Sequence, residues 1–440
     1  MSTDATPQPL THRRVLKIAL PIVLSNATVP LLGLVDVGVV GQIEAPEPIA
    51  AVGMGAIIIT TAYWLFGFLR MGTVSLVGQA AGAGDDAEVS AWLSRALMVA
   101  GVAGLGLIVL QWPLMQVGLW SFTASPEAEA MTATYLSIRI WSAPAAIAVY
   151  ALTGWLVAME RTGAVFWVQL LMNGLNIALN FLFVLGFDWG VAGVALSTAI
   201  AEVVGAAIGL WFCRDAFGRA AAFDRGRIFA RAKLVRMALL NTDILLRSAM
   251  LMAMFYSFVS FGSRFDDATL AANEVLIQFM YVTAYGMDGF AFAAETLIAR
   301  AYGRKDPARV RRSAVLTGFW GAGLCVFCAV AFWLAGPWLI DLLAKDAQVQ
   351  AEARVYLPWM VLAPLVGCVA WMMDGIFIGA GRGRDMRNMM AISFVIYWIA
   401  VAILLPLLGN HGVWAALLVS FLARGVTLSL RYPALERAAA

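Results

Sequence analysis

The sequence predicts an all-α polytopic membrane protein with twelve transmembrane helices, arranged as two pseudo-symmetric lobes of six. Composition, helix-length apolar runs and an internal repeat lead to this prediction. Of the 440 residues, 62% are hydrophobic and only 13% are charged, and the mean hydropathy is +0.83. A soluble domain carries about 25% charged residues, so lipid must be the solvent for most of this chain. A span needs about 20 apolar residues, and the length accommodates about twelve such spans.

Apolar runs bounded by charged residues or by Gly and Pro mark the individual helices. The expected spans are 15–42, 48–80, 88–114, 130–158, 163–186, 190–212, 234–262, 268–301, 309–335, 350–379, 386–408 and 411–431. The first run is too long for the apolar region of a signal peptide and is therefore expected to be the first span. Spans longer than the bilayer is thick are expected to tilt.

Lys and Arg gather in alternate loops, and this asymmetry sets the predicted orientation. The richest loop, 213–236, holds seven of them: Arg214, Arg219, Arg225, Arg227, Arg231, Lys233 and Arg236. The loops of the opposite side hold only Arg264, Lys345 and Arg354. Both termini of this multi-pass chain are therefore expected on the cytoplasmic side of a bacterial inner membrane. The acidic turn at 85–88 departs from the pattern, but acidic residues carry little weight in it.

An internal repeat relates the two halves of the chain. The run Gln79–Asp85 recurs as Arg300–Asp306, an offset of 300 − 79 = 221 residues, and the same offset pairs Gly154 with Gly375. Each half then holds six helices, so the two halves share one orientation and form parallel repeats, which place a substrate site between lobes that rock against each other. The predicted division is a tail 1–14, a first lobe 15–212, a linker 213–233, a second lobe 234–431 and a tail 432–440.

Ionisable residues inside the spans are the functional candidates, because each costs about 2.5–3.5 kcal/mol at a helix centre. Asp36 lies in Gly33-Leu34-Val35-Asp36-Val37-Gly38, about 10 Å inside the predicted outer end of the first span. A carboxyl group in a low-dielectric site favours its neutral form, so it can bind and release a proton. The alternative is a carboxylate held permanently by a hydrogen bond or by an Arg of another helix.

Amide side chains form a polar stripe on the expected helix 163–186. Asn173, Asn176 and Asn180 are spaced three and four residues apart and therefore share one helix face. Thr198, on the next helix, is expected to join them. Such groups hydrogen-bond a carboxyl group such as that of Asp36, bind a solute, or hold helices together. We favour a pocket shared with Asp36.

The second lobe carries its own set of in-span polar residues. Asp243 and Arg247 are four residues apart, a spacing that favours an ion pair within one helix. Asp288 and Glu295 lie one heptad apart on the next helix, and Asp374 lies on the expected helix 350–379. A buried network between Arg247 and one of these acids is the expectation, with structural pairing and a direct part in transport as the two alternatives.

Two prolines lie inside the first expected helix. Pro30 cannot donate to the carbonyl of Asn26, and Pro21 cannot donate to that of Lys17, so each removes a helical hydrogen bond. Either proline is a candidate hinge that couples protonation of Asp36 to the shape of the helix, with a static kink as the alternative.

Several function classes are disfavoured by what the sequence lacks. The pair Cys325 and Cys328 lies in an apolar run without further ligand-type residues, and the histidines are His12 and His411. We therefore expect no enzyme, no cofactor and no structural metal site, with sodium at Asp36 or Asp374 as the open alternative. A phosphate-binding G-x-x-x-x-G-K-[ST] motif is absent, so an ion gradient is the expected energy source.

Ordered motifs along the chain resemble the multidrug and toxic compound extrusion (MATE) family, and within it the bacterial DinF-like branch. The matching stretches are 19–22, 33–36, 63–72, 241–248, 284–291 and 385–388. They extend from the first expected helix to the eleventh. The set is specific because of its order, since each stretch alone is a modest signal.

The resemblance implies a V-shaped, alternating-access antiporter with two six-helix lobes. It implies export of amphipathic, often cationic organic compounds in exchange for protons or sodium, by a monomer in contact with membrane lipids and without nucleic acid. The family's first-helix acid maps onto Asp36 and its polar partners onto Asn176, Asn180 and Thr198. Some archaeal relatives carry a carboxylate where this chain has Asn180, and the single acid here favours protons over sodium.

Two other functions compete with export. A flippase for lipid-linked precursors of the wider superfamily needs a strongly cationic cavity, whereas the in-span Arg70, Arg139 and Arg247 are accompanied by acids. A non-transporting membrane receptor or scaffold is the second alternative, and the absence of counterflow in reconstituted vesicles would favour it.

Overall fold

The described structure is helical throughout, which confirms the predicted fold class. The computed structural model describes residues 9–28, 35, 38–39, 46–122 and 124–440, and no strand occurs among them. Ten helical segments of this described part are long and apolar enough to cross a bilayer. The expected span 268–301 forms a helix, Asp267–Gly303, that is not one of the ten. Its polar residues, such as Asn273, Asp288 and Glu295, lower its hydropathy.

The chain folds into two compact units. The N-unit comprises Leu24–Met237, and the C-unit comprises Met1–Val23 together with Ala238–Ala440. These divisions fall at other positions than the sequence-based boundaries, since the start of the first helix lies in the C-unit. Close packing accounts for this placement: a Cβ atom at Gly289 would lie only 2.8 Å from the carbonyl oxygen of Ala19.

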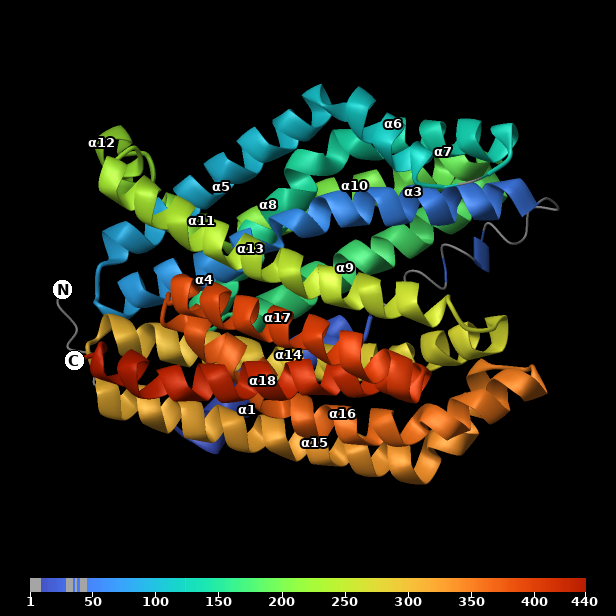
Figure 1. Cartoon of the computed structure of the whole chain (residues 1–440). Helices are drawn as coiled ribbons and strands as arrows, with labels where there is room; N and C mark the ends of the chain where they lie inside the picture. The colour runs from blue at the N-terminus through green and yellow to red at the C-terminus, as the bar shows by residue number, and fades with distance from the viewer. Residues whose placement is uncertain (1–8, 29–34, 36–37, 40–45, 123) are drawn as a thin grey trace. The chain divides into compact units, whose positions relative to one another are not determined.

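The N-unit is built from helices joined by short turns (Figure 1). Its helices are α3 Pro46–Trp64, η1 Leu65–Gly67, α4 Phe68–Gly82, α5 Asp86–Val109, α6 Gln111–Trp120, α7 Pro126–Arg139, η2 Ile140–Ser142, α8 Ala143–Ala158, α9 Thr162–Asn180, the π-helical η3 Phe181–Gly186, α10 Gly190–Phe212, α11 Arg214–Phe217, η4 Ala220–Ala222 and α12 Arg225–Ile228. The expected linker 213–233 therefore contains three short helices rather than an irregular chain.

The C-unit consists of long helices around one apolar core. Its helices are α13 Arg231–Gly262, α14 Asp267–Gly303, α15 Pro307–Leu343, α16 Ala347–Gly379, α17 Gly383–Leu408 and α18 Asn410–Arg437, with most of α1 His12–Asn26. Helices α15 and α18 are longer than expected because they continue through Pro337 and Pro433. The expected tail 432–440 is accordingly helical as far as Arg437.

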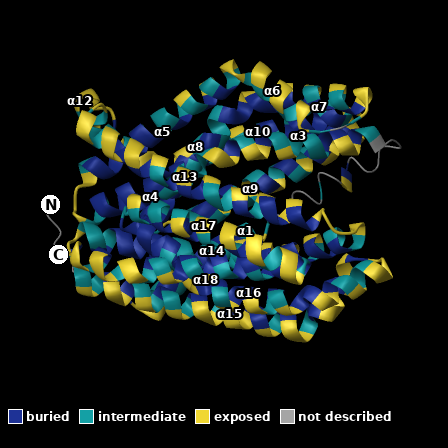
Figure 2. Cartoon of the chain, viewed as in Figure 1, coloured by how far each residue is buried: buried dark blue, intermediate teal, exposed yellow. Residues whose placement is uncertain are grey.

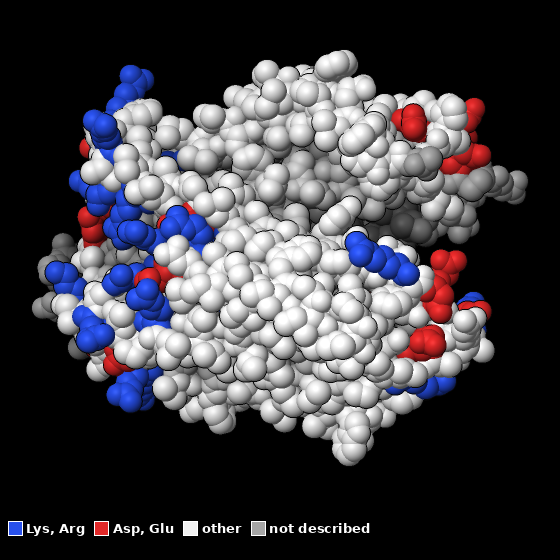
Figure 3. Space-filling model, viewed as in Figure 1, with Lys and Arg blue, Asp and Glu red and all other residues white. Residues whose placement is uncertain are grey.

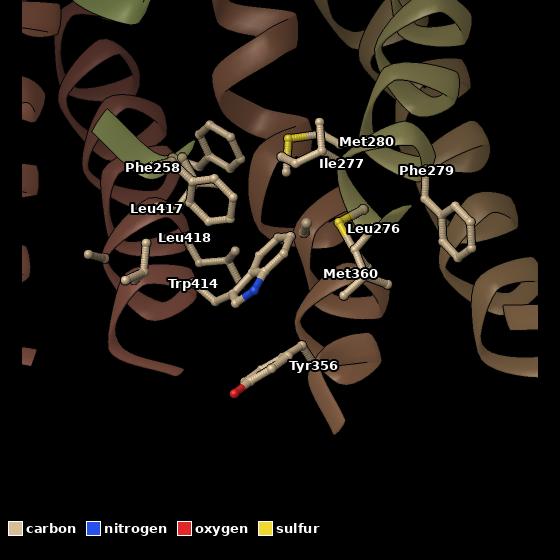
Figure 4. Packing of buried hydrophobic residues seen from close by; sticks show 14 of the residues in the cluster. Phe258, Leu276, Ile277, Phe279, Met280, Tyr356, Met360, Trp414, Leu417 and Leu418 are labelled. Atoms are coloured by element: carbon tan, nitrogen blue, oxygen red, sulfur yellow. The ribbon is translucent and has the colours of Figure 1, made fainter. Parts of the chain in front are cut away.

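Buried hydrophobic residues that include Phe258 and Trp414 pack together in the C-unit core (Figure 4), and amide side chains bond to Trp414 beside them. The rings of Phe258 and Trp414 meet edge to face, with centroids 4.7 Å apart. The Trp414 Nε1–H group donates to Asn273 Oδ1 over 2.9 Å, and Asn273 and Asn410 exchange two amide hydrogen bonds of 2.9 Å each. The polar groups of this core are thus satisfied by one another, as burial in lipid requires.

Helix α1 is shorter than the expected span 15–42. It ends at Asn26, and a turn follows in which the Thr28 N–H group donates to the Ser25 carbonyl over 3.1 Å. The carbonyl of Asn26 is the one that Pro30 cannot bond, which agrees with an end at this residue. Pro30 and Asp36 themselves lie outside the described residues, whereas Pro21 lies inside α1.

Left-handed backbone positions recur in both halves of the chain with the offset of the sequence repeat. Positive φ angles occur at Gly84 and Lys305, at Glu160 and Gly381, and at Asp188 and Gly409, and each pair is 221 residues apart. One member of each pair is a glycine, the residue that adopts this conformation at no steric cost. After the first pair, Asp85 and Asp306 both cap the next helix, each accepting a backbone N–H over 2.9 Å. The repeated sequence is therefore a repeated helical corner.

A close helix crossing recurs in the same way. A Cβ atom added at Gly154 of α8 would lie 2.6 Å from the carbonyl oxygen of Arg70 in α4. A Cβ atom at Gly375 of α16 would lie 2.8 Å from that of Ala291 in α14. Both the glycines and the carbonyls they approach are 221 residues apart. Small residues let the backbones of membrane helices approach closely, and here they do so at the same point of each half.

The outward faces of the helices are apolar. Figure 2 shows many exposed residues along the helices, and large ones on α15 include Phe327, Trp333 and Leu334, which are 67%, 70% and 70% exposed. In each unit the charged side chains visible in Figure 3 lie toward the helix ends, and uncharged surface lies between them. This distribution is the one expected of helices that face hydrocarbon with their sides and water with their ends.

The glycine crossings generate a stability prediction. We expect Gly154→Ala and Gly375→Ala each to lower the free energy of unfolding by about 1–3 kcal/mol, because the added methyl group meets a backbone oxygen that cannot rotate away. Thermal unfolding of the purified protein in detergent measures the effect. Gly174→Ala and Gly323→Ala are the matched controls, since a Cβ atom at either position meets nothing within 4 Å. Equal midpoints for all four variants would contradict the close crossing.

Candidate functional site

The predicted stripe on α9 forms a connected chain of hydrogen bonds inside the N-unit. Asn180 Nδ2 donates to Asn176 Oδ1 over 3.0 Å, and Asn176 Nδ2 donates to the Thr198 hydroxyl of α10 over 2.8 Å. One turn earlier, Asn173 Nδ2 donates to the Thr28 hydroxyl over 2.8 Å. All three Asn residues are at most 5% exposed. The structure therefore brings together Asn176, Asn180 and Thr198, as the sequence predicted.

One further member of this polar chain was not predicted. The Ser197 hydroxyl is fully buried, and its single proton is shared between two acceptors, Asn180 Oδ1 and the Val194 carbonyl oxygen. Directly after Asn180, helix α9 widens into the π-helical turn η3, a local distortion that occurs often at functional sites. Ser197 directly precedes Thr198 in the sequence, but a serine among small residues of a membrane helix gives no signal of its own.

The turn that follows helix α1 contacts this stripe through Thr28. Asp36 itself lies outside the described residues. Thr28, the residue that contacts the stripe, lies eight residues before it in the sequence. The Thr28 hydroxyl accepts a hydrogen bond from Asn173 Nδ2 and donates one to the Ser25 carbonyl over 2.7 Å. The turn after α1 is thereby hydrogen-bonded to the α9 stripe.

A buried ion pair lies deeper in the same unit. Arg139, at the end of α7, donates two hydrogen bonds to Glu202 of α10, of 2.7 and 3.0 Å. The Tyr63 hydroxyl donates to the Arg139 carbonyl over 2.8 Å and so adds α3 to the group. Arg139 was identified from the sequence, but Glu202 was not. The signal was available, since Glu202 is a lone carboxylate in an apolar helix, four residues from Thr198 and hence on the same face.

Asp243 and Arg247 of the C-unit each pair with a residue of another helix, and for Arg247 this residue is Asp374, one of the three acids expected in its network. Arg247 contacts Asp374 of α16, and Asp374 also lies 3.8 Å from Arg424 of α18. Asp243 instead accepts from Arg387 of α17 over 2.6 Å. The predicted pair within α13 is therefore replaced by two bridges between helices. A spacing of four residues permits a contact, but an acid on another helix can approach the guanidinium end-on.

The cluster around Asp374 carries an excess of positive charge. Two guanidinium groups face one carboxylate, and all three residues are less than 9% exposed. The Nε atoms of Arg247 and Arg424 have no hydrogen-bond partner within the described structure. The other predicted acids of this unit lie on α14, where Asp288 is half-buried and Glu295 is buried. A cation at Asp374 would meet the repulsion of both arginines.

The acidic residues at the start of α5, which depart from the charge rule, are paired with basic residues. The Glu88 carboxylate accepts from Arg95 over 2.8 Å and lies 3.4 Å from Arg227 and 3.5 Å from Lys233. Asp86 lies 3.2 Å from Arg219. The acids of this turn thus neutralise part of the basic segment 213–236. Nearby, a hydrogen bond from Arg161 holds the pKa of Asp215 below its usual range.

The described residues contain no group of three or more His, Cys, Asp or Glu side chains able to hold a metal ion. The four cysteines, Cys213, Cys325, Cys328 and Cys368, are buried thiols without a disulfide.

Comparison with known proteins places this chain in a family. The MatE family model matches residues 21–182 and 244–404. The chain is 35% identical to the DNA damage-inducible protein F of Escherichia coli K12, over 94% of this chain and 90% of that protein. It is 25% identical to the probable multidrug resistance protein NorM of Rhizobium meliloti, over 96% of this chain and 93% of that protein. The two family matches begin 223 residues apart, which agrees with the internal repeat.

Solved structures show the same fold. A mutant of the Vibrio cholerae MATE transporter VcmN aligns with a TM-score of 0.87 at 18% identity, covering 97% of both chains. The predicted layout of twelve helices in two lobes fits the fold of these transporters. The extent of the family match and the identity to the Escherichia coli protein together show that this chain is a member of the MATE family of membrane transporters, in its DinF-like branch.

Proposed function

We propose that this protein exports amphipathic, often cationic organic compounds from the cytoplasm of a bacterium in exchange for protons. Its membership of a family that contains multidrug resistance proteins supports export as the activity. In this proposal both termini face the cytoplasm, and Asp36 is the group that binds the proton. Asn176, Asn180 and Thr198 line the pocket of that carboxyl group.

The hydrogen-bonded chain of α9 and α10 is the observation that carries the proposal. It consists of amides and hydroxyls, which both donate and accept and can therefore serve a carboxyl group in its neutral and its ionised form. Thr28, eight residues before Asp36 in the sequence, is hydrogen-bonded to Asn173 of this stripe, which supports the assignment of Asp36 to the same pocket. A pocket that accommodates both protonation states is what a group that loads and releases protons requires.

Coupling to protons is favoured over coupling to sodium by the surroundings of the two candidate acids. The amides and hydroxyls of Asn176, Asn180 and Thr198 are uncharged, so in this pocket Asp36 alone would compensate the charge of a sodium ion. Asp374 already faces Arg247 and Arg424, so its charge is compensated without a metal ion.

The first prediction concerns Asp36. We expect Asp36→Asn to abolish efflux driven by a pH gradient, because an amide cannot take up a proton in this range, while the protein still inserts and folds. Uptake of a fluorescent organic cation into inverted vesicles measures transport, and the melting midpoint checks folding. Asp267→Asn, at an exposed acid beside a loop, is the control. Efflux of Asp36→Asn equal to that of the parent would remove Asp36 from the mechanism.

The polar chain of α9 gives a second prediction. We expect Asn180→Leu to reduce proton-driven efflux at least tenfold and to lower stability by about 1–3 kcal/mol, because Ser197 and Asn176 lose buried partners. Asn410→Leu in the C-unit removes a comparable buried amide pair and serves as the control. It should lower stability without a matching loss of transport per folded molecule. Equal losses of transport in both variants would show that Asn180 has only a structural role.

The third prediction separates the coupling ions. An imposed pH gradient should drive transport in sodium-free vesicles, whereas a sodium gradient at equal pH should not. Asp374→Asn should lower stability by about 3–5 kcal/mol, because it leaves two buried guanidinium groups without a counter-charge. Transport driven by sodium alone and lost in Asp374→Asn would favour the sodium alternative.

A further inference from the structure

We propose that the segment 213–231 forms a binding surface for the headgroups of anionic phospholipids. The segment joins two candidate spans, Gly190–Phe212 and Arg231–Gly262, and therefore lies where a bilayer surface would be. Clusters of basic residues next to spans attract anionic lipids, and aromatic side chains settle at the same depth. The proposal concerns the lipid surroundings of the protein and does not depend on the transported compound or the coupling ion.

The segment is fastened to α5 and so presents a defined surface. Buried Arg95 donates to the carbonyls of Arg227 over 2.5 Å and Ile228 over 3.0 Å, and the Ser94 hydroxyl donates to that of Ala222 over 2.7 Å. Because Arg95 is fully buried and donates to backbone carbonyls, it holds the backbone of the segment in place but adds no charge to the exposed surface of the segment. The path of this segment is thus set by hydrogen bonds at three of its residues.

Apart from Arg214, which stacks on Trp211, the basic residues of the segment divide into two groups. One group, Arg219 and Arg227 together with Lys233 beyond the segment, is paired with Asp86 and Glu88. The other group is Arg225 and Arg231, whose guanidinium groups are exposed and contact no acid of the described structure. These two arginines therefore carry positive charge that no acid of the described structure neutralises.

Exposed aromatic rings accompany these two arginines. Phe223 is 68% exposed and Phe229 is 59% exposed, although both belong to a segment whose backbone is held in place. With the arginines they give the order Phe223, Arg225, Phe229, Arg231 along nine residues. At the end of α10, Trp211 is also exposed and stacks with Arg214 at 4.3 Å. Water is a poor solvent for these rings, whereas the boundary between headgroups and acyl chains accommodates both rings and guanidinium groups.

The test uses the full-length protein in a neutral detergent. Phosphatidylglycerol is titrated in and the melting midpoint followed, with phosphatidylcholine of the same acyl chains as the neutral comparison. The parent protein should be stabilised by phosphatidylglycerol well beyond phosphatidylcholine, since a ligand of the folded state raises the midpoint. Arg225→Gln/Arg231→Gln should need about tenfold more phosphatidylglycerol for the same shift. Phe223→Ser/Phe229→Ser should weaken the response to phosphatidylglycerol as well.

Matched controls keep the test decisive. Arg264→Gln/Lys345→Gln removes two exposed basic residues from the opposite loops and should leave the titration unchanged. Glycerol phosphate, which lacks acyl chains, should give no comparable shift. The proposal is overturned if the Arg225/Arg231 variant responds like the parent, if the control variant loses the response equally, or if glycerol phosphate reproduces it. Midpoints in phosphatidylcholine that match the parent show that the variants are folded.

Discussion

Lipid offers no hydrogen bonds, and this constraint organises the polar interior of the protein. Backbone groups are satisfied within the helices, and hydroxyls such as that of Thr317 bond a carbonyl of their own helix, but amide and charged side chains in a span need partners on other helices. The amides of α9 meet hydroxyls of α10, Arg139 meets Glu202, and the carboxylate of Asp374 meets Arg247. The residues that hold the helices together are therefore also those from which a transport pathway can be built.

The helices were largely predictable, because the requirement for a long apolar run is local. The expected span 190–212 coincides with α10 Gly190–Phe212, and most other ends agree within a few residues. The larger differences arise at prolines. Pro337 and Pro433, both exposed, lie inside helices that are longer than expected. Helix α1, in contrast, ends at Asn26, four residues before Pro30.

The site was predictable only where its geometry is local. Spacing along one helix identified the stripe of Asn173, Asn176 and Asn180, because helical periodicity fixes which residues share a face. Partners on other helices could be named only as a set. Arg247 was expected to meet one of Asp288, Glu295 and Asp374, and the structure pairs it with Asp374, 127 residues away. Glu202 was overlooked although it is a lone carboxylate in an apolar helix, and spacing along one helix does not indicate its pairing with Arg139 of another helix.

The left-handed corners have a consequence for how the two halves have diverged. In each matched pair, one half uses glycine and the other uses Lys305, Glu160 or Asp188, so the turn is retained whichever side chain occupies it. For a non-glycine residue this conformation costs about 1–2 kcal/mol, an amount that surrounding helices can offset. The sequences of two duplicated halves can therefore diverge while their turns keep the same backbone conformation. Positive φ angles at equivalent positions then remain as evidence of the duplication where the residue types differ.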